Sequence, residues 1–109
     1  KDEEINGVKL RLQKVDGLPP KELRKLVDKG KKELSDGIVI VFAIKDDKVG
    51  IAVGVTDSLI EKFDAVKFVK VGSEIIGGHG GGGRKDFAQA GGQDQSKIDE
   101  AFEKLKNLI

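Results

Sequence analysis

The feature that most constrains this chain of 109 residues is a glycine-rich segment at residues 77–92, with the sequence GGHGGGGRKDFAQAGG. Six of its first seven residues are glycine, and Arg84 and Lys85 follow them directly. Glycine has no Cβ, so the backbone can adopt conformations and close approaches that other residues forbid. Such a segment can bring bare N–H groups and basic side chains to one anion. The pattern favours a phosphate-contacting loop; a flexible linker or a tight crossing of two segments is the alternative.

Two nucleotide-binding motifs resemble this segment, and neither fits it. Residues 78–83 formally match GxGxxG, but that fingerprint follows a strand and opens a helix, whereas a helix is expected before this segment. A P-loop ends in Gly-Lys followed by Ser or Thr, whereas this run ends in Gly-Arg-Lys. We therefore expect no cofactor in this chain.

Composition narrows the chemistry further. The chain has one His and no Cys, so cysteine ligation of a metal is excluded and we expect no metal site. Asp86 and Asp94 stand without a His or a second carboxylate at a defined spacing, so we assign no catalytic residue. No apolar run approaches the roughly 20 residues of a membrane span, so we expect no membrane partner. The lack of Cys is compatible with a cytoplasmic location.

Charge is unevenly distributed along the chain. The net charge is only +1, yet residues 9–32 hold nine basic side chains against three acidic ones. A local basic surface on a near-neutral domain is typical of proteins that bind polyanions. An ordinary solvated helix rich in lysine is the alternative. The chain begins at Lys1 and contains no Met, so we expect it to be an excised or processed part of a longer protein.

Hydrophobic periodicity predicts one domain over residues 1–109, of the α/β (α+β) class. Alternation predicts a strand over 5–15, and a continuous apolar run predicts a buried strand over 38–44, followed after a hairpin by a strand over 49–55. Helical spacing predicts helices over 20–34, 65–76 and 96–108, the last with a capping box at its start. The expected order is β-α-β-β-α, a loop or short strand, then α. We expect a small mixed sheet with the helices packed mainly on one face.

Individual residues of the segment have distinct expected roles. Arg84 can form a bidentate contact to a phosphate, or an ion pair with Asp86, and Lys85 adds a second positive charge. Gln89 can orient the backbone or reach a ribose or base. His79 can contact a phosphate or a base, although a lone His among glycines is more typical of an exposed, replaceable position. The candidate nucleic-acid-binding residues are Gly77, Gly78, His79, Gly80, Gly81, Gly82, Gly83, Arg84, Lys85, Gln89, Gly91 and Gly92.

The segment resembles the glycine-rich motif of the C-terminal, DHHA1-type (C-Ala) domain of alanyl-tRNA synthetases, which typically has the form GGxGGGRPxxAQAGG. The AQAGG ending at residues 88–92 is the specific part of the match, and the order of strands and helices before it extends the resemblance over most of the chain. This chain differs by one extra glycine and by Lys85 where proline is usual. The resemblance implies a helical segment that usually precedes the globular part and helps the family to dimerise, and we expect dimerisation by that route to need residues beyond these 109.

The resemblance implies a non-catalytic module of a larger alanine–tRNA ligase, whose ATP and metal sites would lie in other domains. It implies binding to the outer corner of tRNA, specifically tRNA-Ala, so that the aminoacylation and editing sites act on one tRNA. The expected partners are therefore tRNA and the other domains of the synthetase, and other nucleic acids are a further candidate. Two alternatives stay open: a substrate-binding domain of a DHH-type phosphoesterase, and a structural or dimerising domain.

Overall fold

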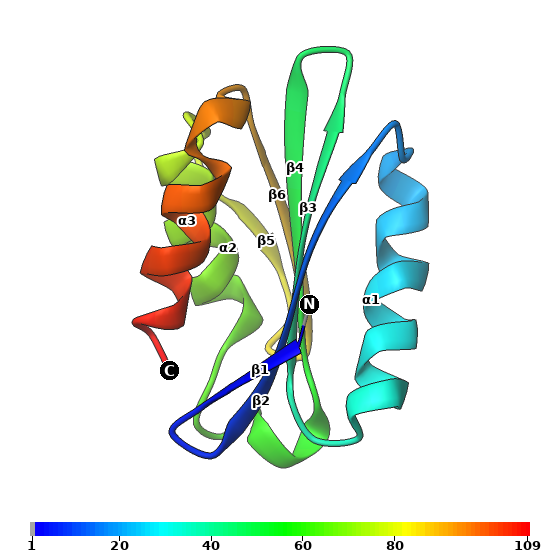
Figure 1. Ribbon diagram of the computed structural model, residues 1–109, viewed down its shortest axis with the longest axis vertical. Coiled ribbons are helices and arrows are strands. Elements are labelled where there is room, and N and C mark those ends of the chain that lie inside the picture. The colour runs from blue at the N-terminus through cyan, green and yellow to red at the C-terminus, as the bar shows by residue number, and fades with distance from the viewer. Residues whose placement is uncertain (1) are drawn as a thin grey trace.

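The computed structural model describes residues 2–109, apart from the side chains of residues 20 and 21, and forms one sheet covered by helices on both faces (Figure 1). The elements in chain order are β1 (Asp2–Ile5), β2 (Val8–Asp16), α1 (Pro20–Leu34), β3 (Ile38–Lys45), β4 (Lys48–Val55), η1 (Asp57–Leu59), α2 (Ala65–Ile75), β5 (Gly81–Gly83), β6 (Phe87–Gly92), η2 (Gln95–Lys97) and α3 (Ile98–Lys106), where η marks a 3-10 helix.

The sheet is mixed and has the strand order β1-β2-β3-β4-β6-β5. β2 and β3 run parallel and are joined through α1, whereas every other neighbouring pair is antiparallel. β3 lies centrally and is buried from Ile38 to Ala43, which confirms the strand predicted from its continuous apolar run. The prediction of a small mixed sheet with three helices is also confirmed.

Alternate residues of β3 serve two hydrophobic cores. Ile40 and Phe42 belong to the larger core, beneath α2 and α3. Val39 and Val41 belong to the smaller core, beneath α1. Figure 1 shows α1 on one side of the sheet and α2 with α3 on the other. Two of the three helices thus share a face, and the sheet needs apolar residues on both of its faces.

The N-terminal strand differs from the sequence prediction. A single strand over 5–15 is wrong, because the chain turns at Asn6 and Gly7, whose φ angles are +51° and +82°. Both values lie in the left-handed region, which an Asn-Gly pair adopts readily in a two-residue hairpin. The turn adds β1 as an antiparallel edge strand beside β2.

The start of the last helix also differs from its prediction. Ser96 was expected to cap it, but α3 begins at Ile98 and a 3-10 turn precedes it. The carboxylate of Asp94 caps the 3-10 turn by accepting the backbone N–H of Ser96 at 3.0 Å, and α3 itself begins after Lys97 without a side-chain cap. An Asp side chain readily accepts the N–H of the residue two positions further on, and this local turn replaces the cap expected from Ser96.

Candidate nucleic-acid interface

The glycine-rich segment forms the outermost hairpin of the sheet rather than a loop alone. α2 ends at Ile75, the chain continues through 76–80 into β5, and β6 returns antiparallel to it. The register pairs Gly82 with Gln89. Because β5 is the last strand of the sheet, its outer edge presents backbone N–H and C=O groups without a neighbouring strand.

Six of the candidate residues lie in β5 and β6, and the other six form two groups at opposite ends of β5. Residues 77–80 lie at one end of β5, beside Gly91, whereas Arg84 and Lys85 form the turn at the other end. Gly80 and Arg84 are four residues apart, which corresponds to about 13 Å along an extended strand. One phosphate therefore cannot touch both groups, but an extended polyanion can.

A buried serine fixes the first group, and the sequence analysis missed it. Ser73 is fully buried near the end of α2, and its hydroxyl donates to the carbonyl of Gly91 at 2.6 Å. The same hydroxyl accepts the N–H of Gly80 at 3.1 Å, and the Ser73 carbonyl accepts the N–H of Gly78 at 2.7 Å. A serine on the apolar face of a helix directly before a glycine run is the signal that would have found it.

Most of the candidate glycines are required by the fold itself. An added Cβ at Gly78 would lie 1.8 Å from the carbonyl oxygen of Gly91, and one at Gly81 would lie 2.1 Å from that of Gln89. Gly83 combines a φ of +149° with a contact of 2.4 Å to the carbonyl oxygen of Phe87. The remaining members of this class are Gly77 and Gly80, which have φ angles of +82° and +89°, and Gly92, which is crowded by Ile76.

Gly82 and Gly91 are different. A Cβ at Gly82 would meet nothing within 4 Å, and one at Gly91 would make only an ordinary contact of 3.7 Å. Neither residue has a left-handed φ. Glycine in a strand costs about 0.5–1 kcal/mol relative to alanine, so neither position is explained by the packing of the domain.

The turn between β5 and β6 carries the basic side chains. Nε of Arg84 lies 3.4 Å from Oδ1 of Asp86, which is the ion pair considered from the sequence, and the Arg84 side chain is 67% exposed. Exposed pairs of this kind contribute at most about 1 kcal/mol, so a phosphate can replace Asp86. Lys85 is exposed, and its carbonyl accepts the N–H of Ala65 at 2.9 Å, which ties the turn to the start of α2.

The other candidate side chains divide between surface and core. His79 is exposed, and Gln89 is half-buried on the face of the sheet that α1 covers. Phe87 is a core residue, 8% exposed, and the guanidinium of Arg24 lies 4.6 Å from its ring centroid. Arg24 therefore lies beside β6, although the strand and the helix are far apart in sequence.

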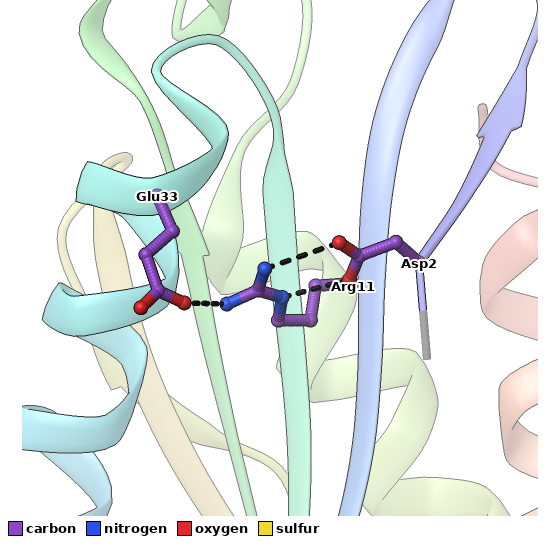
Figure 2. Close-up of polar contacts among 3 residues, drawn as sticks. All are labelled: Asp2, Arg11 and Glu33. Carbon is purple, nitrogen blue, oxygen red and sulfur yellow. Dashed lines mark hydrogen bonds and ion pairs between the residues drawn. The ribbon is translucent and has the colours of Figure 1, made fainter.

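Arg11 is engaged within the domain (Figure 2). Its guanidinium donates to both carboxylate oxygens of Asp2, at 2.7 and 3.1 Å, and also to Glu33 on α1. These hydrogen bonds raise the pKa of Arg11, and the bond from Arg11 lowers the pKa of the Asp2 carboxyl. Arg11 thus ties β1, β2 and α1 together, so we exclude it from the basic groups available to a ligand.

The structure holds no cluster suited to a metal within residues 2–109, in the sense of three or more His, Asp or Glu side chains gathered together. None of the helices formed by these residues is long and apolar enough to cross a membrane.

Comparison with known proteins gives consistent relatives. The DHHA1 domain family matches residues 7–109. Alanine–tRNA ligase of Parvibaculum lavamentivorans is 50% identical over 108 residues, and that of Hyphomonas neptunium is 48% identical over 107 residues. In both cases the match covers 98% of this chain and 12% of the relative, so the chain spans about an eighth of their length.

Solved structures extend the comparison. The C-Ala domain from Aquifex aeolicus alanyl-tRNA synthetase superimposes with a TM-score of 0.93 at 30% identity, covering 99% of this chain and 96% of that domain. RecJ from Thermus thermophilus matches with a TM-score of 0.63 at 11% identity, over 90% of this chain and 14% of RecJ. The second likeness concerns the fold alone.

Proposed function

The chain belongs to the DHHA1 domain family, as a domain of the C-Ala type, and from this premise we propose that it is a non-catalytic module that binds tRNA. The proposal includes the outer corner of tRNA-Ala as its target. It also places the chain within a larger alanine–tRNA ligase of the cytoplasm, where it would help the aminoacylation and editing sites to act on one tRNA. ATP and metal would be bound by other domains of that enzyme.

The observation that supports this proposal most is the geometry of the edge hairpin. β5 offers an exposed edge without side chains, and the exposed residues Arg84 and Lys85 stand at one end of it. Phosphate oxygens accept hydrogen bonds from backbone N–H groups and from arginine and lysine side chains. Since the two candidate groups are about 13 Å apart, they would contact different phosphates of one folded RNA.

Recognition would depend on shape more than on base sequence. The grooves of A-form RNA resist reading by side chains, so a corner formed by folded loops is recognised through its backbone and its unpaired bases. The chain has five aromatic residues, all Phe, and Phe42, Phe68 and Phe87 are buried. Phosphate contacts are therefore expected to supply most of the affinity, which makes binding dependent on salt.

Replacing both basic residues of the turn tests this function. In Arg84→Ala plus Lys85→Ala, we expect weaker binding to a tRNA-Ala transcript, and a slope of log K against log[salt] reduced in magnitude by about 2, because two phosphate contacts are lost. Fluorescence anisotropy at several salt concentrations measures both quantities.

The matched control removes two charges elsewhere, with Lys97→Ala at the end of η2 plus Lys104→Ala in α3. These residues are exposed and lie outside the hairpin, so the slope should stay at the value of the unmodified chain. Binding that does not depend on salt, or a slope that falls equally in both double variants, would overturn the assignment of the turn.

A further inference from the structure

A concave surface lies on the face of the sheet that α1 covers, between the start of α1 and the β3–β4 hairpin. It is an open groove with a volume of about 440 Å³, within the usual range for small-ligand sites. Leu18 and Leu23 form an apolar wall, and Gly50 with Gly91 forms part of the floor. We call this surface the α1 groove.

The floor of the α1 groove includes two glycines that the packing of the domain does not require. Gly50 pairs with Ala43 on one side and with Gly91 on the other, so the two glycines lie in one row across the sheet. A Cβ at Gly50 would meet Leu23 at an ordinary distance of 3.5 Å, and Gly91 has similar room. Two adjacent glycines that the fold does not require leave a flat patch of backbone open to a planar group.

The rim of the α1 groove supplies positive charge. Lys45 and Lys48 are directly opposite each other on β3 and β4, and Lys45 shares its face with Ala43 because it lies two residues further on. Like charges opposite each other in a sheet are unfavourable, and among residues 2–109 neither lysine forms an ion pair. Asp46 also lines the groove, so its lining side chains carry a net charge of +1.

We propose that the α1 groove binds one unpaired nucleotide of the RNA. The base lies flat on the backbone of Gly50 and Gly91, against the wall made by Leu23. Its phosphate lies between the ammonium groups of Lys45 and Lys48. The amide of Gln89, which also lines the groove, can both donate to and accept from a base edge. A base inside a duplex cannot enter, because both of its faces are stacked, so the groove selects looped-out nucleotides.

This inference rests on the proposed function but uses different residues from the β5–β6 turn. Gly91→Val tests it, because valine suits a strand and its side chain would fill the floor of the groove. The probes are a tRNA-Ala transcript and a blunt-ended RNA duplex without unpaired bases. We expect Gly91→Val to lose about tenfold in affinity for the transcript, and to lose less for the duplex, which has no unpaired base to insert. Gly91→Ala should lose less.

The outcomes separate this inference from the proposed function. If the unmodified chain binds neither RNA, the proposed function fails. If it binds the transcript and Gly91→Val binds it equally well, only the α1 groove is wrong. A second measurement needs no variant: in NMR titrations a single-stranded RNA tetranucleotide should shift the amide resonances of Gly50 and Gly91 more than the duplex does. Equal shifts with both probes would also overturn the inference.

Discussion

Gly78→Ala is expected to destabilise the domain by about 3 kcal/mol or more, the largest effect we expect from the loss of a single glycine. The new Cβ would lie 1.8 Å from the carbonyl oxygen of Gly91 and 2.4 Å from the hydroxyl of Ser73. Neither atom can move cheaply, because the Ser73 hydroxyl is buried and bonded to that same carbonyl. Urea denaturation followed by circular dichroism measures the loss.

Gly82→Ala is the matched control for this prediction. Gly82 belongs to the same glycine run, but its Cβ would meet nothing within 4 Å and its φ is not left-handed. Stability should change by less than about 1 kcal/mol, and a gain is reasonable because alanine restricts the unfolded chain. Equal losses in Gly78→Ala and Gly82→Ala would contradict the division of the glycines into those that the fold requires and those that it does not.

Phe42→Ala is expected to cost about 3–5 kcal/mol, a large part of the 5–15 kcal/mol that usually stabilises a domain. Phe42 is fully buried in the middle of β3, and its ring meets Phe102 of α3 edge to face, with centroids 5.0 Å apart. The truncation leaves a cavity between the sheet and α3 that rigid neighbours cannot fill. Thermal unfolding should show a melting temperature lower by roughly 12 °C or more.

Phe42→Leu provides the comparison, because it keeps an apolar side chain in the same place and should cost clearly less. Phe102→Ala should cost less stability than Phe42→Ala, because Phe102 is only partly buried. If Phe42→Ala left the melting temperature within a few degrees of the unmodified chain, the larger core would not depend on the contact between β3 and α3.

The sequence predicted the elements whose local signal agrees with their final environment. Residues 38–44 form a continuous apolar run, and the strand they predict is buried on both faces. The hairpin expected at Asp46 and Asp47 is also present, with φ angles of +52° and +66°. In these cases periodicity and turn chemistry indicate the same structure as tertiary packing, so local sequence information suffices.

The strands at the two edges of the sheet could not be predicted in the same way. β5 consists of glycine alone, a residue depleted in strands, and it forms because β6 provides an antiparallel partner and α2 packs beside it. β1 pairs with the adjacent β2 across the Asn6-Gly7 turn, so its hairpin had a local signal, but the alternation of residues 5–15 indicated one longer strand. The ion pair of Glu3 with Lys106 of α3, at 3.1 Å, leaves no periodic trace in the sequence.

The glycine run and the basic pair after it indicated a candidate site, but they did not predict the geometry of that site. The sequence suggested that the N–H groups of the whole glycine run and the side chains of Arg84 and Lys85 could surround one anion, whereas β5 separates residues 77–80 from Arg84 and Lys85 by the length of a strand. Adjacency in sequence does not give adjacency in space once a segment becomes extended. The use of Ser73 as a clamp on the loop, and the approach of α1 to β6, likewise depend on tertiary structure.

Footprinting of a bound tRNA-Ala transcript tests most directly our proposal that the edge hairpin binds the outer corner of tRNA. Hydroxyl-radical cleavage with and without the chain would map the protected nucleotides. We predict protection concentrated where the loops of the tRNA meet at its corner, and weaker protection there with Arg84→Ala plus Lys85→Ala. Protection spread evenly along the phosphate backbone, and unchanged in that variant, would contradict the account.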